Sequence, residues 1–278
     1  MKQTKAEMTL TQKSTQSFYH WLAGFTDGAG YFYVDSKNHP RFEITTALND
    51  EHVLQQIKQF FPGSLKIRSG AQTIRLRISQ KQILQDLISA VNGKIRYPKR
   101  QLQLQTLCVY FGISFQSPES FCFENAYLAG LLDSAGTITI TVSKSSSELS
   151  IEKGVEGRIH RLQYSGAYHQ LKCQITSIDI KFLEDIAYGC GFGKIYSQKA
   201  NKQNRNRNTI HHWTCQSEKE INSFLNYIQK YKLRSQKRKR FFLIPKYLVL
   251  KSQKAHLCED GSMQKKAWFR FCRKWFQG

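Results

Sequence analysis

The Lys and Arg side chains of this 278-residue sequence are numerous enough to indicate what kind of ligand the protein binds. Lys and Arg total 42 against 20 Asp and Glu, which gives a formal net charge of +22 and a pI near 9.8. Such a charge destabilises the compact state unless a polyanion neutralises it. The seven cysteines are scattered and include no CxxC pair. We therefore expect reduced, mostly buried thiols, and neither a zinc site nor a disulfide framework.

The positive charge is concentrated in residues 194–256, where 16 Lys or Arg stand against Glu218 and Glu220. A solvated helix face could carry some of these charges, but a field of one sign and this strength predicts a nucleic-acid ligand. Hydrophobic residues make up 40% of the chain, enough for a folded core. No apolar run approaches the ~18 residues that span a membrane, so we expect no membrane partner.

Alternating segments place polar groups on one face of a sheet. In 72–79 (QTIRLRIS), every second residue is Ile or Leu, and the same period recurs in 137–144 (TITITVSK) and 169–177 (HQLKCQITS). An ordinary solvated face would show this pattern too. Its repetition in so basic a chain favours a face that contacts phosphates and base edges. From these strands we predict nucleic-acid contacts by Arg75, Arg77, Lys172 and Gln174.

Two nine-residue segments repeat one another at a displacement of 106 residues: 22–30 reads LAGFTDGAG and 128–136 reads LAGLLDSAG. Similar elements follow each copy. After the first we predict strands at 31–35, 41–48, 63–69 and 72–79, and helices at 51–61, 81–91 and 101–111. After the second we predict strands at 137–144, a pair within 158–176, and 208–216, with helices at 180–188 and 218–231 and a turn at 189–197. Each half thus follows an αββαββα order, and the fold class is α+β with internal pseudo-two-fold symmetry, in a monomer.

The repeat divides the chain into five parts. We predict a basic polar N-terminal extension (1–16), a first repeat (17–115), a linker (116–123), a second repeat (124–257) and a basic aromatic tail (258–278). The extension lacks the apolar segment of a signal peptide. Residues 201–208 (NKQNRNRN) have the composition of a basic loop. In the tail, Trp268, Phe271, Cys272 and Trp275 form one helical stripe, which we expect to dock on its own domain or a neighbour.

Both nine-residue segments resemble the motif of the LAGLIDADG homing endonucleases, in the single-chain form that carries two motifs. The resemblance covers roughly residues 18–257 and extends to segments such as PRFEITTALND, NGKIRYPKR and GFGKIYS. It implies that two motif helices pack closely through their small residues, and that two antiparallel sheets form a saddle over DNA in the major groove. It also implies an Asp or Glu at the eighth motif position of each copy, where the two acids hold divalent metal ions that activate water.

This sequence departs from the family at those two positions, which are Ala29 and Ala135. A methyl group neither ligates a metal nor transfers a proton. By the resemblance, Asp27 and Asp133, at the sixth position, are structural groups of the helix end. We therefore predict no catalytic residue, no metal ligand and no cofactor, with Mg²⁺ relevant only if the acids were restored. Nothing in the sequence places Asp35 near this site.

Basic residues near the motifs and in the 194–256 segment complete the predicted interface. Lys99 and Lys237 hold matching places in the two halves and resemble the family's supporting basic residues. Contacts with phosphates at the surface are an equally supported role for them. Besides the strand residues above, the predicted nucleic-acid contacts are Lys99, Arg100, Lys194, Lys202, Arg205, Arg207, Lys237, Arg238, Lys239 and Arg240.

Three accounts explain a nuclease fold without its acids: a descendant that binds but does not cut, deliberate replacement of both acids, or an enzyme with displaced carboxylates. We favour the first, a catalytically inactive protein bound to organelle RNA. That RNA would be ribosomal RNA, with neighbouring ribosomal proteins, or intron RNA. The alternative is a site-specific double-stranded DNA homing endonuclease, natural or disabled; a DNA binder of the transcription-factor kind is a third class. RNA is preferred to DNA, and an organelle location, mitochondrion before chloroplast, follows from the resemblance and from an N-terminus unlike a transit peptide.

Overall fold

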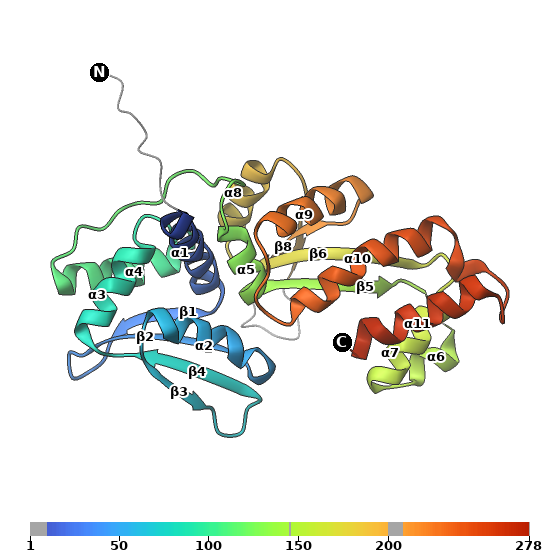
Figure 1. Cartoon of the computed structure of the whole chain (residues 1–278), viewed down its shortest axis with the longest axis horizontal. Helices are drawn as coiled ribbons and strands as arrows, with labels where there is room; N and C mark the ends of the chain where they lie inside the picture. Colours follow the sequence, from blue (N-terminus) through green and yellow to red (C-terminus); the bar gives the residue numbers. More distant parts are fainter. Residues whose placement is uncertain (1–9, 145, 200–207, 278) are drawn as a thin grey trace, which may run out of the picture.

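Two similar halves, each an antiparallel four-stranded sheet covered by helices, form the computed structural model of the chain (Figure 1). The structure describes residues 10–144, 146–199 and 208–277. The first nine residues of the predicted extension lie outside this range. So does nearly all of the predicted basic loop, with Lys202, Arg205 and Arg207.

The first half begins with a 20-residue helix that contains the first motif. Its elements are α1 (Leu10–Ala29), β1 (Gly30–Val34), β2 (Pro40–Ala47), the short η1 (Leu48–Asp50), α2 (Glu51–Phe60), β3 (Ser64–Ile67), β4 (Thr73–Ile78), α3 (Lys81–Val91) and α4 (Pro98–Phe111). Pro98 stands in the first turn of α4, where its missing N–H costs no hydrogen bond. Gly112 ends that helix in the left-handed conformation.

The second half repeats this order with helical additions. Its elements are α5 (Tyr127–Ala135), β5 (Gly136–Val142), α6 (Ser147–Ile151), α7 (Gly154–Gln163), β6 (His169–Ser177), α8 (Ile180–Cys190), β7 (Lys194–Gln198), β8 (Ile210–Cys215), α9 (Glu218–Lys230), α10 (Lys237–Ser252), η2 (Ala255–Leu257) and α11 (Met263–Gln277). Ser217 and Glu220 form a capping box at the start of α9.

The two sheets have the same topology, which confirms the predicted α+β class. Their strand orders are β1-β2-β4-β3 and β5-β6-β8-β7, so β2 and β6 each pair with a strand that is not next in sequence. Ile74, Leu76 and Ile78 of β4 are buried on the face that the helices cover, and Leu171, Cys173 and Ile175 of β6 do the same in the second half. The intervening polar residues face away from the helices.

Two predicted elements were wrong. The predicted turn at 189–197 ends in strand β7, because Lys194–Gln198 pairs with β8. The predicted strand pair within 158–176 is instead helix α7 followed by the single strand β6, whose partner is β5. Ile159 and Leu162, three residues apart and both buried, belong to a helical face that an alternating pattern does not describe. Helix α1 begins at Leu10, so the last seven residues of the predicted extension are helical.

Helix α11 closes the far end of the second half. It packs on α7, α10 and η2, and Figure 1 shows it beside α6 and α7. Trp268, Phe271, Cys272 and Trp275 are all buried in this contact, so the aromatic stripe is part of the chain's own core. Within the described residues, no helix has the length and apolar character needed to cross a membrane.

Candidate nucleic-acid interface

Helices α1 and α5, the motif helices, touch backbone to backbone. A Cβ atom at Gly24 would lie 1.9 Å from the carbonyl oxygen of Tyr127, and one at Gly130 would lie 1.8 Å from that of Trp21. Only glycine permits this approach. At Gly28, near the end of α1, a Cβ would meet the Ser134 side chain of α5. The close contact therefore brings the C-terminal ends of the two motif helices together.

Each motif helix ends in an alanine, whose side chain is a methyl group. Ala29 is the last residue of α1 and Ala135 the last of α5, and both are half-buried. A cavity of about 290 Å³ opens beside this junction, with Asp27, Gly28, Arg100 and Ala135 among its lining residues. Among the described residues, no group of three or more His, Cys, Asp and Glu side chains could hold a metal ion.

Asp27 fastens the start of α4 to α1. Its Oδ2 accepts hydrogen bonds from the backbone N–H of Arg96 (2.8 Å) and Tyr97 (3.2 Å), and from the Tyr127 hydroxyl (2.5 Å). Burial raises the pKa of Asp27 to about 7, against these hydrogen bonds and the positive charge of Arg100, which lower it. Asp27 thus joins three elements with one oxygen, while its buried Oδ1 has no hydrogen-bond partner among the described residues.

Asp133 fastens the segment before α10 to α5, and it uses both of its carboxylate oxygens. Oδ2 accepts from the Trp21 indole N–H (2.9 Å) and the Arg234 backbone N–H (2.8 Å). Oδ1 accepts from the backbone N–H (2.9 Å) and hydroxyl (2.5 Å) of Ser235. Trp21 and Tyr127 each precede a motif, so the two aspartates are bound across the pseudo-two-fold axis by equivalent positions. All four acceptor contacts of Asp133 are internal to the protein.

The two matching lysines are placed differently. Lys99 is exposed in the first turn of α4. Lys237 is half-buried, and its Nζ donates to the carbonyl oxygens of Leu132 (2.9 Å), Asp133 (2.7 Å) and Ser134 (3.3 Å) at the end of α5. These contacts take all three donors of the ammonium group. Burial lowers the pKa of Lys237, and the nearby Asp133 and Asp50 charges oppose that shift.

The other predicted contacts divide between solvent and the protein's own groups. Arg238 and Lys239 are exposed on the first turn of α10, and Lys194 is exposed at the start of β7. Arg240 donates to the Ile138 carbonyl (3.2 Å) and lies over the Trp275 ring. Arg100 donates to Gln103 (3.0 Å) and lies over the Tyr31 ring. The structure therefore leaves fewer of these cations free than their sequence positions imply.

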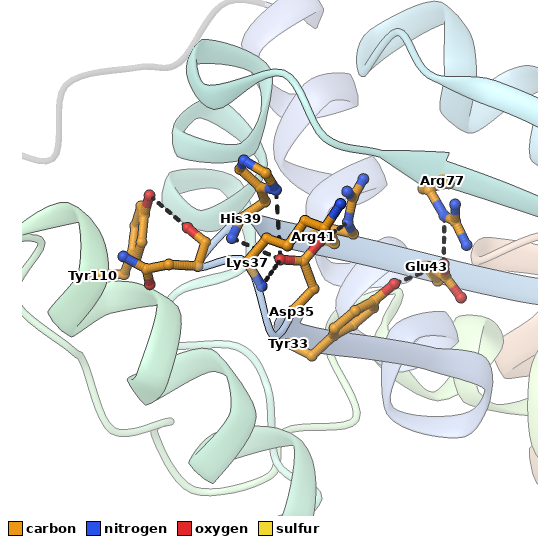
Figure 2. Close-up of polar contacts among 9 residues, drawn as sticks. Tyr33, Asp35, Lys37, His39, Arg41, Glu43, Arg77 and Tyr110 are labelled. Atoms are coloured by element: carbon orange, nitrogen blue, oxygen red, sulfur yellow. Dashed lines mark hydrogen bonds and ion pairs between the residues drawn. The ribbon is translucent and has the colours of Figure 1, made fainter.

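The outward face of the first sheet carries an ion-pair network (Figure 2). Glu43 of β2 accepts from Arg75 Nη1 (2.6 Å) and Arg77 Nε (2.5 Å) on neighbouring β4, and from the Tyr33 hydroxyl (2.9 Å) on β1. Burial raises the pKa of Glu43, but hydrogen bonds from Arg75, Tyr33 and Arg77 outweigh it, and the net shift is downward. The carboxylate stays ionised and holds both guanidinium groups.

A second acidic residue orders the end of the same face. Asp35, just after β1, accepts from the backbone N–H of His39 (2.9 Å) and Lys37 (3.0 Å), and pairs with Arg41 (2.8 Å), as Figure 2 shows. The hydrogen bond from His39, followed by those from Arg41 and Lys37, lowers the pKa of Asp35 to about 2 despite some desolvation. Five residues of strand, or roughly 16 Å, separate Asp35 from the end of α1. It is therefore a turn residue and does not lie at the junction of the motif helices.

The outward face of the second sheet has a different composition. Thr137 and Thr139 of β5 lie opposite Gln174 and Lys172 of β6, and Gln174 lies opposite Thr214 of β8. Lys194 of β7 in turn lies opposite Thr214. Among the strand residues described on this face, none is acidic. The predicted residues Lys172, Gln174 and Lys194 thus share one face with nothing to neutralise the lysines.

We expect Glu43→Gln to tighten nucleic-acid binding by at least about threefold at low salt, because two guanidinium groups lose their internal counter-ion. The slope of log K against log salt should steepen by about 1 to 2, since each freed arginine that reaches a phosphate releases counterions. Fluorescence anisotropy with a labelled DNA duplex and a labelled RNA hairpin, each over a range of KCl, measures both quantities.

Glu184→Gln is the matched control, because Glu184 is an exposed acid on α8 and its removal changes the net charge equally. Equal effects of the two substitutions would mean that the arginines beside Glu43 do not contact the ligand.

Sequence reasoning missed the acids that hold the arginines. Glu43 and Arg77 are directly opposite one another in the β2–β4 pairing, although 34 residues separate them. The signal was present in the alternation of 41–48, which places Arg41, Glu43 and Thr45 on the polar face. The pairing of β2 with β4, which gives that alternation its meaning, is a long-range feature.

Comparison with known proteins gives one family. Residues 22–111 and 128–248 match the model of a family described as LAGLIDADG endonuclease. The chain is 33% identical over 275 residues to the intron-encoded RNA maturase bI4 of Saccharomyces cerevisiae, which is 98% of this chain and 39% of that protein. It is 32% identical to the probable intron-encoded endonuclease aI2 of Debaryomyces hansenii, over 93% of this chain and 37% of that protein. The chain therefore spans about two fifths of the length of these relatives.

A solved structure shares the fold. The LAGLIDADG meganuclease I-AabMI, bound to uncleaved DNA, superimposes with a TM-score of 0.61, over 91% of this chain and 98% of that one. The sequence identity is 18%, so the likeness is one of fold. The residues that match the family model include both nine-residue motifs and all the strands of both sheets.

Proposed function

Because the chain belongs to the LAGLIDADG endonuclease family but ends its motif helices in alanine, we propose that it is a cleavage-deficient nucleic-acid-binding protein. Its principal ligand, on this proposal, is an organelle RNA, and intron RNA before ribosomal RNA. The location we propose is the mitochondrion, since the relatives named above are intron-encoded proteins.

The observation that carries the proposal is the chemistry of the motif-helix junction. Ala29 and Ala135 offer only methyl groups. The two nearby carboxylates do not replace the missing acids: Asp133 has both oxygens engaged by internal donors, and Asp27 has one oxygen engaged and a pKa raised by burial. The residues present therefore do not fit the divalent metal ions that the family implies, and we derive no cleavage step from them.

The preference for RNA over DNA rests on one relative. The relative that is 33% identical over almost the whole chain is named an intron-encoded RNA maturase. The net charge of +22 and the acid-free face of the second sheet suit a polyanion of either kind. The charge thus supports nucleic-acid binding, and the relative's name favours RNA as the ligand that is still bound after the metal-binding acids are lost.

A DNA endonuclease is the second candidate. A relative at 32% identity is named a probable endonuclease, and a structural neighbour is bound to DNA. This function needs carboxylates at the junction from elsewhere in the chain, and Asp35 lies at the far end of β1 from it. The DNA candidate therefore predicts a site-specific double-strand break in Mg²⁺, whereas the RNA candidate predicts none.

Crosslinking in native organelles separates the candidates. We expect ultraviolet crosslinking and sequencing to recover discrete intron RNA segments, while the purified chain with Mg²⁺ or Mn²⁺ leaves organelle DNA uncut. A site-specific break, or no RNA above a mock precipitation, would overturn the proposal. Sedimentation of the lysate tests the ribosomal variant: co-migration with a ribosomal subunit that survives high salt and is lost with RNase would replace intron RNA by ribosomal RNA.

A further inference from the structure

A cleft of about 670 Å³ lies between the two halves, on the side of the helices. We call it the helix-side cleft. Its walls come from α1, from α2, from the connection between α9 and α10, and from the first turn of α10. Trp21 and His52 line it from the first half, and Tyr231, Lys232 and Arg234 from the second. None of these is in a strand.

The cleft is strongly cationic. Among the described residues that line the cleft none is acidic, and five are cationic: Lys230, Lys232, Arg234, Arg238 and Lys239. Lys230 pairs with Glu124 at 2.5 Å outside the cleft. Within the described chain, Lys232, Arg238 and Lys239 are exposed and form no ion pair. Three like charges around one hollow repel one another, so an anion that enters it is bound favourably.

Arg234 lines the helix-side cleft with a side chain that its neighbours hold in place. Its guanidinium lies over the Trp21 and Phe18 rings, 4.9 and 5.2 Å from their centroids, and Nη1 donates to Gln56 Oε1 at 2.9 Å. Burial lowers its pKa, yet a guanidinium stays protonated in proteins. Only one of its five N–H donors serves Gln56, and a planar fork held in place suits a phosphate.

The walls are braced across the two halves. His52 Nε2 hydrogen-bonds the Arg234 carbonyl oxygen at 2.7 Å, and Gln236 N–H donates to Asp50 Oδ1 at 2.7 Å. Because α2 packs on the apolar face of β2 and β4, the cleft lies on the opposite side of the first sheet from Arg75 and Arg77. It is therefore a preformed cationic site separate from the sheet faces.

We propose that the helix-side cleft is a second nucleic-acid site, which holds the sugar–phosphate backbone of a single-stranded RNA segment. Its volume is that of a ligand pocket, roughly 300–1,000 Å³, so it admits a short single strand and excludes a duplex. Lys232, Arg238 and Lys239 contact successive phosphates around the fixed Arg234, and Tyr231 offers a ring on which a base can stack. This inference rests on the proposed RNA function in naming RNA as the ligand.

A charge-reversal variant of the full chain tests the cleft. Lys232→Glu, Arg238→Glu and Lys239→Glu are combined, and Lys219→Glu, Lys266→Glu and Lys274→Glu form a control with the same net charge on exposed positions of α9 and α11. The probe is a fluorescein-labelled oligouridylate, followed by anisotropy over a range of KCl. We expect the cleft variant to bind at least tenfold more weakly, and its salt slope to fall by about 2 for three phosphates at roughly 0.7 each.

The affinity of the control should stay within about twofold of the wild type once the general effect of its lower net charge is removed. Extrapolating log K to high KCl, where long-range charge effects are screened, removes that effect. Equal losses of oligouridylate affinity in the two variants would overturn the proposal that the cleft binds nucleic acid. If a labelled DNA duplex binds the wild type as tightly as RNA does, the proposed RNA function fails, while a loss of oligouridylate binding confined to the cleft variant still supports the cleft.

A measurement on the wild type covers the case in which the variant does not fold. Photocrosslinking with 5-bromouridine RNA, followed by mass spectrometry, should label the peptide that contains Tyr231 of the cleft. Crosslinks confined to the outward aromatic residues of the sheets, Tyr31 and Tyr196, would overturn the proposal.

Discussion

Gly130→Ala is expected to cost more than about 4 kcal/mol and leave little folded protein, because the added methyl group meets backbone that cannot move alone. The new Cβ would lie 1.8 Å from the Trp21 carbonyl oxygen and 2.8 Å from the Phe25 amide nitrogen, both in α1. Relief requires the motif helices to separate, and their contact also positions Asp27 and Asp133. Soluble yield and urea unfolding followed by circular dichroism measure the loss.

Alanine substitutions at two other glycines should cost less stability, for different reasons. Gly28→Ala meets the Ser134 hydroxyl oxygen at 2.0 Å, which side-chain rotation moves away, and the Ser134 Cβ at 2.7 Å, which needs a small shift of the helix ends. The cost should be smaller than at Gly130, where all the close atoms are backbone. Gly166→Ala meets nothing within 4 Å but has a positive φ of 52°, so it should cost only the backbone penalty of about 1–2 kcal/mol. If Gly130→Ala unfolds at the same urea concentration as Gly166→Ala, the close packing of the motif helices is not what holds the halves together.

The features predicted well from the sequence are those that local pattern determines. The 106-residue repeat identifies the two motif helices, and their resemblance to the LAGLIDADG motif implies the pairing of α1 with α5 through small residues. The alternation in 72–79 predicts β4 with its buried Ile and Leu and its outward arginines. Both patterns involve neighbouring residues, or one repeated string, and need no knowledge of distant partners.

The features that were not predicted depend on distant partners. Glu43 neutralises Arg75 and Arg77 only because β2 pairs with β4 across the intervening α2 and β3. Lys237 reads as a surface cation, yet its ammonium lies over the carbonyl end of α5. The helix-side cleft joins α2 to a connection more than 170 residues away, as the His52–Arg234 contact shows. A count of charges along the chain therefore overstates how many are free to bind a ligand.

Asp133→Asn and Asp27→Asn should have opposite consequences, although the two residues hold matching places. Both oxygens of Asp133 accept hydrogen bonds from two donors each, so an amide NH₂ in either orientation faces two donors in a buried site. We expect Asp133→Asn to cost about 3–5 kcal/mol. In Asp27 only Oδ2 accepts, and the amide oxygen of Asn can take its place while the NH₂ replaces the unpartnered Oδ1.

The raised pKa of Asp27 adds a pH dependence whose sign follows from linkage. In the unfolded chain this carboxyl loses its proton near pH 4, whereas in the folded protein burial keeps it protonated up to about pH 7. The folded state therefore binds the extra proton between these values, and stability falls as the pH rises from about 4 to 7, by at most about 1.4 kcal/mol per pH unit. Asp27→Asn removes this loss, so its stabilising effect relative to the wild type should be small at pH 4.5 and much larger at pH 7.5.

Urea unfolding of the wild type and both Asn variants at pH 4.5 and 7.5 measures these effects as differences between proteins. The difference is needed because other groups titrate in the same range: burial, followed by neighbouring positive charges, lowers the pKa of His20 and of His169 to about 4. Those histidines contribute equally to every variant and cancel. If Asp27→Asn tracked the wild type at both pH values, Asp27 would be ionised in the folded protein, and its carboxylate would be available to a cation in the adjoining cavity. The cleavage-deficient assignment would then rest on Ala29 and Ala135 alone.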